Sequence, residues 1–229
     1  MKRLQTIEEA RDWFFTVSDS GESLDMDSLE DTESLAFSVG DGGLLNDIGA
    51  CYFEGKGVKQ DQERAVELYQ KGTAFGDMTA ASNLGFCYYY GNGTKKDLMK
   101  AFLTFSKAER LGSLEAEYML GDMYLKGEIV EKDVATAFCS YQKLYQYLLR
   151  YEDNGEEDRE YQQLMSAVSK RLARCYHYGW GTMEDKDKAE YLLAKAVFFY
   201  RKRLKWGDYY ASEGYEEAMG MMGEWREAR

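Results

Sequence analysis

Hydrophobic residues recur along most of the chain at the three- and four-residue spacing of amphipathic helices. Short segments of glycine and polar residues separate these stretches, which predicts helices joined by tight turns. One stretch shows the spacing clearly, with apolar side chains at Val134, Ala137, Phe138, Tyr141, Leu144, Tyr145 and Leu148. The chain is therefore predicted to be all-α.

The pattern occurs in four copies. Gly85 lies 36 residues after Gly49 and 36 residues before Gly121, and a fourth copy begins at Ala173 after 16 additional residues. From each of these origins, tyrosine follows at offset three, glycine at six, aspartate at twelve, alanine at sixteen and lysine at twenty-two. A repeat of this length predicts a solenoid, in which each unit buries its apolar face against its neighbours.

Each recurring residue has a physical role in a helix–turn–helix unit. The aspartate precedes the second helix and can accept the backbone N–H groups of its first turn as an N-cap. The glycines end the first helix, because glycine tolerates positive φ. The small residues at the origin and at offset sixteen allow the two helices to approach closely.

This spacing resembles the Sel-one-like repeat family, a relative of the tetratricopeptide repeats, over residues 46–200. The resemblance implies an α/α right-handed superhelical solenoid of about four 36-residue helix-turn-helix repeats with N- and C-terminal capping helices. It also implies an adaptor rather than an enzyme. Some positions depart from the family pattern, among them Ile129 at the second turn glycine and Ala173 at the origin.

The predicted N-terminal segment, residues 1–45, contains capping helices and an acidic linker. A helix over 1–17 begins with a capping box of Thr6 and Glu9, and a second helix is predicted from Leu29 to Val39. The acidic run between them has two interpretations, a solvated linker or an arm for a basic partner.

The other departures from the repeat lie after the third unit. The insertion is predicted to lengthen one hairpin, which then protrudes at about residues 150–165 with an acidic turn, 152–158, at its tip. Residues 201–229 are predicted to contain a C-terminal capping helix with Ser212 as its N-cap. The cluster Arg201, Lys202, Arg203 and Lys205 is interpreted as a solvated helix end or, alternatively, an anion site.

Composition narrows the partners. The chain has 229 residues and a formal net charge of −12, which disfavours nucleic acid and, if the expected protein or peptide partner is charged, favours a basic one. No apolar run approaches the ~18 residues of a membrane span, and residues 1–15 do not resemble a signal peptide. We expect a cytoplasmic protein that does not bind a membrane, although secretion by a signal-independent route stays open.

Candidate chemistry is sparse. His177 is the only histidine, and Cys175 and His177 lie about 200° apart on a helix, so they cannot share a metal ion or form a nucleophile pair. The Gly-x-Gly pairs follow helices rather than strands, which indicates turns rather than phosphate sites. The four cysteines are interpreted as reduced and buried. We therefore expect no catalytic residues, no metal and no cofactor.

The candidate binding residues lie on the first helix of each unit, at offsets that are not needed for stacking. Such positions form rows along a solenoid and would line its concave face, although these aromatic residues can also serve only to pack one hairpin on the next. The predicted partner-binding residues are Phe53, Glu54, Phe86, Tyr89, Tyr90, Asp122, Lys126, Arg174, His177 and Tyr178.

The predicted function is a non-catalytic scaffold or adaptor that binds a peptide or protein segment in this concave face. A narrower alternative is an inhibitor or immunity protein for a toxin or enzyme. A third alternative, from another class, is a hydrolase of a small cell-wall-type molecule, which would need a pocket with polar groups around His177.

Overall fold

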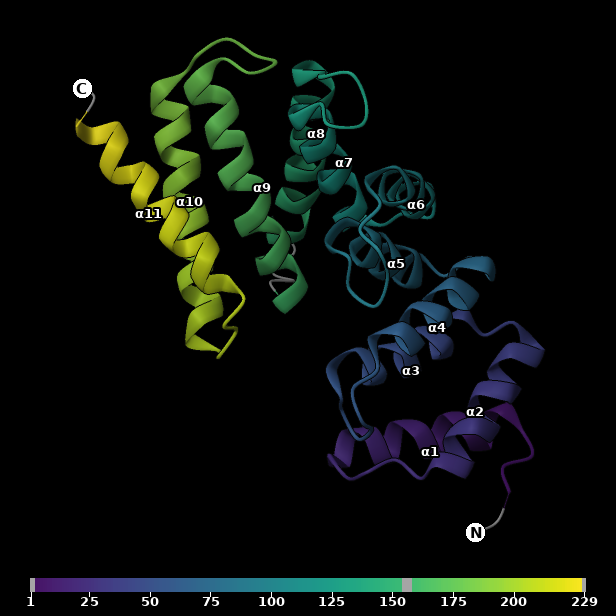
Figure 1. Cartoon of the computed structure of the whole chain (residues 1–229). Helices are drawn as coiled ribbons and strands as arrows, with labels where there is room; N and C mark the ends of the chain where they lie inside the picture. Colours follow the sequence, from purple (N-terminus) through teal and green to yellow (C-terminus); the bar gives the residue numbers. More distant parts are fainter. Residues whose placement is uncertain (1–2, 154–157, 228–229) are drawn as a thin grey trace. The chain divides into compact units, whose positions relative to one another are not determined.

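The structure is a computed structural model that describes residues 3–153 and 158–227, which form eleven helices and no strand (Figure 1). These residues divide into two compact units, one ending at Ala116 and the other beginning at Glu117. The all-α prediction is confirmed for this part of the chain. The predicted boundaries near residues 45 and 200 separate the repeats from the capping helices, which is a different division from that into compact units. They stay a prediction.

The first unit contains two N-terminal helices and two helical hairpins. Its helices are α1 (Ile7–Ser20), α2 (Met26–Val39), α3 (Gly42–Glu54), α4 (Gln62–Ala74), α5 (Met78–Tyr90) and α6 (Leu98–Arg110).

The second unit contains two hairpins and a C-terminal helix. Its helices are α7 (Leu114–Lys126, whose first turn belongs to the first unit), α8 (Val134–Asp153), α9 (Arg159–Tyr178), α10 (Lys186–Lys205) and α11 (Ala211–Glu227). The helices of the predicted long hairpin, α8 and α9, have 20 residues each where α3 and α5 have 13. Most of its predicted tip lies outside the described residues.

The turns within the hairpins use the predicted chemistry. Asp61, Asp97, Asp133 and Asp185 each accept the backbone N–H three residues further on. Gly55, Gly91 and Gly179 end the first helices in the left-handed conformation, where a side chain would be strained. The glycine pairs are therefore structural turns, as predicted.

The origin glycines pack against an aromatic ring at offset twenty. A Cβ atom on Gly85 would lie 2.6 Å from the ring of Phe105, and one on Gly121 would lie 2.6 Å from the ring of Tyr141. Gly49 faces Tyr69 in the same way. This close approach, rather than helix contact alone, explains why glycine occupies these origins.

Several local predictions need correction. The first helix, predicted over residues 1–17, instead runs from Ile7 to Ser20. It follows Thr6, whose side chain accepts from the backbone N–H of Glu9. The last helix begins at Ala211, so Ser212 is not its N-cap; the Ser212 hydroxyl instead donates to the carbonyl oxygen of Tyr209 at 2.7 Å. Cys139 is exposed rather than buried.

The acidic N-terminal segment is mostly helical and partly paired, so a solvated linker does not describe it. Glu33 on α2 accepts from Arg64 at 2.5 Å and from Lys71 at 2.7 Å, both on α4. Asp31 pairs with Arg3 at 3.1 Å. The Glu33 contacts join α2 to the first hairpin, and both carboxylates are already engaged within the unit.

Burial accounts for the state of the other three cysteines, which are free thiols. It raises the pKa of Cys87 and of Cys175 to about 12, and it raises the pKa of Cys51 as well. These side chains therefore stay protonated at neutral pH and pack as small apolar groups.

Candidate functional site

The predicted binding residues fall into two groups, one in each unit. Phe53, Glu54, Phe86, Tyr89 and Tyr90 lie on α3 and α5 of the first unit. The remaining five lie on α7 and α9 of the second unit: Asp122, Lys126, Arg174, His177 and Tyr178.

In the first unit, three of the predicted residues meet at the end of α5. The Phe86 ring stacks on the Tyr90 ring with 6.3 Å between centroids, and Tyr89 meets Tyr90 edge to face at 5.0 Å. Phe105 of α6, which is buried, contacts Phe86 edge to face at 5.1 Å and supports the three rings from the core side. Tyr90 is 61% exposed. We call Phe86, Tyr89 and Tyr90 the aromatic cluster.

The two predicted residues on α3, Phe53 and Glu54, have different surroundings from the aromatic cluster. Phe53 is half-buried and packs against the core formed between α4 and α5, which includes Tyr69 and Leu84. Glu54 is exposed at the end of its helix. Phe53 therefore serves packing at least in part, as the alternative interpretation of these aromatics expected.

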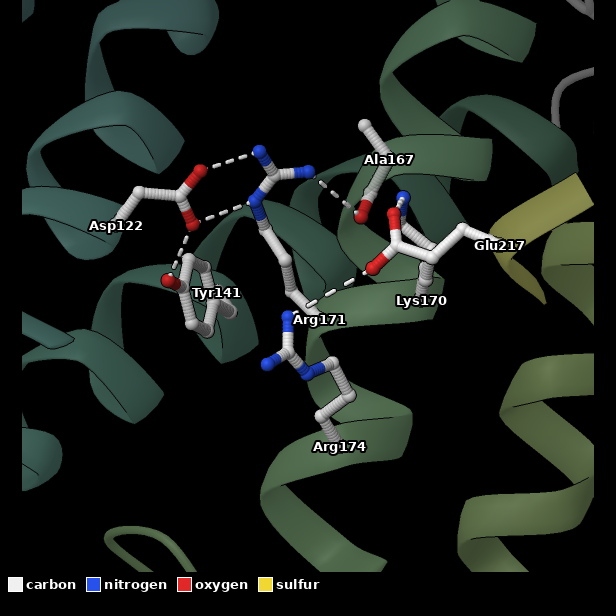
Figure 2. Close-up of polar contacts among 7 residues, drawn as sticks. All are labelled: Asp122, Tyr141, Ala167, Lys170, Arg171, Arg174 and Glu217. Atoms are coloured by element: carbon white, nitrogen blue, oxygen red, sulfur yellow. Dashed lines mark hydrogen bonds and ion pairs between the residues drawn. The ribbon is translucent and has the colours of Figure 1, made fainter. Parts of the chain in front are cut away.

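In the second unit, Asp122 is bound by residues of two other helices (Figure 2). Arg171 of α9 donates to both carboxylate oxygens, from Nε to Oδ1 at 2.7 Å and from Nη2 to Oδ2. The Tyr141 hydroxyl of α8 donates to Oδ1 at 2.6 Å. Arg171 also donates to the carbonyl oxygen of Ala167 and lies 4.5 Å from the centre of the Tyr118 ring.

The pKa values of this group follow from burial and pairing. Burial, the largest influence, would raise the pKa of Asp122, but the charge and hydrogen bonds of Arg171 outweigh it and hold that pKa below its ordinary value. Burial likewise works against the charged form of Arg171, and Asp122 outweighs it and raises the pKa of the guanidinium. Both groups are charged at neutral pH, so Asp122 is a structural anchor rather than an open ligand for a partner.

The last helix places a glutamate beside the predicted binding residues of α9. Glu217 of α11 accepts from Lys170 at 2.5 Å and lies 3.9 Å from the Arg174 guanidinium (Figure 2). Figure 1 shows α11 running along the α9–α10 pair. Sequence reasoning assigned this helix only a capping role and did not connect it with α9.

His177 is covered by the same helix. Its ring stacks on Trp225 of α11, with 3.8 Å between centroids and 6° between planes, and Tyr178 meets it edge to face at 4.7 Å. Burial and the nearby Lys186 charge lower the pKa of His177. The imidazole therefore packs as a neutral ring, whereas the hydrolase alternative needs it in a polar pocket.

A pocket of about 350 Å³ lies beside this row and includes three predicted residues, Asp122, Lys126 and Arg174. Trp180, which stacks on Tyr178 at 4.9 Å, forms part of its wall. The pocket residues that sequence reasoning missed are Leu125, Lys132, Lys170, Arg171, Trp180 and Glu217. The spacing of Lys170, Arg171 and Arg174 on one helix was the available signal.

The basic cluster predicted at the end of α10 is different from expectation. Arg203 is 7% exposed and donates to Ser166 at 2.9 Å and to Asp208 at 2.8 Å. Arg203 is therefore a buried, paired residue, whereas Arg201 and Lys205 are exposed, as a solvated helix end requires.

Among the described residues, no three His, Cys, Asp or Glu side chains come together as a metal site would require. None of their helices is long and apolar enough to cross a bilayer.

Comparison with known proteins gives a consistent result. A family model described as Sel1 repeat matches residues 45–74, 79–113, 114–138 and 170–197, which is 118 of the 229 residues. A Sel1 repeat protein from Oxalobacter formigenes is similar in structure, with 23% identity over 98% of this chain and 100% of that chain and a TM-score of 0.52. No curated protein matches the chain at a significant level.

Two further solved structures are similar to lesser extents. A protective antigen present in uropathogenic Escherichia coli strains, which displays an SLR fold, has 21% identity over 95% of this chain and a TM-score of 0.52; this chain spans 57% of its length. An immunity protein from Pseudomonas aeruginosa has 16% identity over 86% of this chain and 84% of that chain, with a TM-score of 0.37. The latter value is too low to support an argument about function.

Proposed function

The chain belongs to the Sel1 repeat family, and from this premise we propose that it is a scaffold that binds a peptide or protein segment along the first helices of its hairpins. Proteins of this family generally mediate protein–protein interaction and are typically non-catalytic. The proposal adds where this chain binds, and it names the aromatic cluster on α5 as the principal contact.

The observation that supports this assignment most is the exposure of Tyr90. Its side chain is 61% exposed although it stacks on Phe86 and touches Tyr89, so an aromatic surface continues from the core to the outside. Tyrosine at such a position buries a large area when a partner covers it and keeps a hydroxyl for hydrogen bonding. Phe105 holds the cluster rigid, which lowers the entropy lost on binding.

The test is affinity capture with a double variant, Tyr89→Ala and Tyr90→Ala. We expect the wild-type chain to retain a partner from the lysate of its source and the double variant to lose it. Circular dichroism should show the same helix content for both, because Tyr90 is exposed and Tyr89 is only half-buried. Tyr191→Ala is the matched control, since Tyr191 is 62% exposed and belongs to α10 of the other unit.

Retention of the same partner by the double variant would refute the assignment to the aromatic cluster. Loss of the partner from the Tyr191→Ala control as well would mean that exposed tyrosines act without regard to place. Mass spectrometry of the captured protein would also decide the narrower prediction, an inhibitor or immunity protein for a toxin or enzyme, which stays a prediction.

The hydrolase alternative also stays a prediction and has its own test. The His177 ring is stacked on Trp225 rather than placed among polar groups, so we expect His177→Ala to have no effect on hydrolysis of small cell-wall fragments. A turnover that disappears in that variant would support the hydrolase.

A further inference from the structure

The pocket in the second unit is locally positive in an acidic chain. Two acids, Asp122 and Glu217, lie in its lining, and the cations outnumber them by three: Lys126, Lys132, Lys170, Arg171 and Arg174. The whole chain has a formal charge of −12. Because charges more than about 8 Å away are largely screened at physiological salt, the local charge decides which group enters the pocket.

Two of these cations, Lys170 and Arg171, are already paired with carboxylates of the chain. Arg171 gives two hydrogen bonds to Asp122 and a third to Ala167, and Lys170 donates to Glu217 at 2.5 Å (Figure 2). The side chains of Lys170 and Arg171 are only 12% and 19% exposed. Their charges are therefore largely offset by Asp122 and Glu217 within the chain.

Arg174 differs from these two. Its side chain is 39% exposed, and its guanidinium lies 5.3 Å from the centre of the Trp180 ring. The nearest carboxylate oxygen, on Glu217, is 3.9 Å away, which is an ion pair but too long for a hydrogen bond. A planar guanidinium held against an indole, with donors facing a pocket, is suited to bind a carboxylate with two hydrogen bonds.

Glu217 shows which group the site accepts. A carboxylate carried by α11 lies between Lys170 and Arg174, at 2.5 and 3.9 Å, and it is itself 47% exposed. The site thus already accommodates one monoanionic side chain from within the chain. A second carboxylate can approach Arg174 from the pocket side, where Lys126 and Lys132 lie.

We propose that this pocket binds a carboxylate of an acidic protein segment, with Arg174 as its principal donor and Trp180 as the wall for the aliphatic part of the side chain. The inference rests on the proposed function and specifies the chemistry of the partner. It replaces the basic partner favoured by net charge with one that carries an Asp or Glu side chain, or a chain terminus, at the contact.

A free inorganic phosphate suits the pocket less well than a carboxylate. The net positive lining attracts both anions, so charge alone does not distinguish them. Trp180 does, because it offers apolar surface that phosphate cannot use but a glutamate stem can. The shared feature is an anion, and the experiment separates the two sources.

The test is a titration followed by the indole N–H signal of Trp180 in 15N-labelled full-length chain. Three probes are compared: the blocked peptide acetyl-Glu-Leu-Glu-Leu-amide, the same peptide with glutamine for glutamate, and inorganic phosphate. We expect the glutamate peptide to shift the Trp180 signal with saturation, and the glutamine peptide to leave it in place.

Two variants sharpen the result in opposite directions. Arg174→Gln should weaken binding of the glutamate peptide about tenfold, as expected for loss of one charge-assisted contact. Glu217→Gln removes the competing acid and should tighten binding. Arg201→Gln on α10 is the matched control, because it removes an exposed arginine outside the pocket and should leave the affinity unchanged.

Three results would overturn the proposal: equal binding of the glutamine peptide, no change in affinity for Arg174→Gln, or phosphate binding as tight as that of the glutamate peptide. The last outcome would assign the pocket to a free anion. If the Tyr89→Ala, Tyr90→Ala variant loses a captured partner that Arg174→Gln retains, the scaffold function stands and the acidic-segment site is wrong.

Discussion

Helices α5 and α9 occupy the same place in their hairpins and yet carry different chemistry. Two residues before its origin, α5 has Asn83, whose amide donates to Asn46 of α3 at 2.9 Å. At the equivalent position α9 has Arg171, which binds Asp122 of α7 with two hydrogen bonds. The same repeat position joins neighbouring first helices by a neutral amide pair in one unit and by a partly buried ion pair in the other.

The difference extends to the exposed residues. The end of α5 presents aromatic rings, whereas α9 presents cations whose neighbour is Glu217 of α11. Recurring residues of the repeat build the hairpin, and the residues that differ between copies set what each unit can bind. A contact made by the first unit should therefore depend little on salt, and one made by the second unit should depend strongly on it.

Breaking the ion pair should give the largest effect. Arg171→Met leaves the mostly covered Asp122 carboxylate without its counter-charge, and we expect the free energy of unfolding to fall by about 3 kcal/mol. Asn83→Ala in the first unit removes a neutral hydrogen bond and should cost only about 1 kcal/mol. Urea denaturation followed by circular dichroism measures both values.

A double variant serves as the control for that comparison. Combining Arg171→Met with Asp122→Leu removes both charges, and we expect it to recover most of the lost stability, because no buried charge is then left unpaired. Equal losses for Arg171→Met and Asn83→Ala would show that the ion pair is no more important than the amide pair.

The second prediction concerns the origin of the repeat, glycine in the second hairpin and alanine in the fourth. Gly85→Ala places a Cβ atom 2.6 Å from the Phe105 ring, and we expect a loss of about 2 kcal/mol from overpacking. The fourth hairpin has Ala173 at the origin and Leu193 at offset twenty. Adding Phe105→Leu to Gly85→Ala should therefore cost less than the sum of the two single changes.

Thermal denaturation of the two single variants and the double variant gives this coupling directly. Phe105→Leu alone is the necessary control, since it leaves a cavity of its own. Strict additivity of the two changes would disprove the explanation of the origin glycine by its aromatic neighbour.

The repeat pattern was sufficient to predict the hairpins and their turns, because glycine and aspartate act within a few residues of themselves. The partner of the origin glycine was also present in the sequence, as Tyr69, Phe105 and Tyr141 all lie at offset twenty, but it was not recognised. Its role becomes visible only once the two helices are placed against each other.

The candidate site was less predictable, for a physical reason. Asp122 and Arg171 are 49 residues apart across the insertion, and Glu217 lies 47 residues after Lys170. Their pairing depends on how α7, α9 and α11 pack, which no local pattern specifies. Of the first-helix positions, Tyr90 and Tyr178 are exposed, whereas Asp122 and His177 are engaged with other helices.

The third prediction uses pH to separate the two pairs. The pKa of Asp122 is lowered in the folded chain, so its contribution to stability is present above the unfolded value of about 3.8 and is lost as the pH falls through the folded value. The difference in unfolding free energy between wild type and Asp122→Asn should therefore be constant above about pH 5 and shrink below pH 4.

Asn83 provides the contrast for this measurement, because an amide pair does not titrate. The cost of Asn83→Ala should stay the same over the whole range, as measured by urea denaturation at each pH. A stability difference for Asp122→Asn that does not change with pH would mean that its carboxylate is not charged in the folded chain.

The smallest effect concerns His177, the one histidine, whose signals in an NMR titration need no assignment among others. Burial under α11 and the charge of Lys186 lower its pKa, so its midpoint should lie below the ordinary 6.5. The neutral ring is favoured in the folded chain, and stability should therefore decrease as the pH falls from about 6.5.

Trp225→Ala removes the stacked ring and should move the midpoint back toward 6.5, whereas Trp13→Ala in the first unit should leave it unchanged. A midpoint that stays the same in Trp225→Ala would show that α11 does not cover α9 in solution, and the contrast between an open α5 and a covered α9 would then be lost.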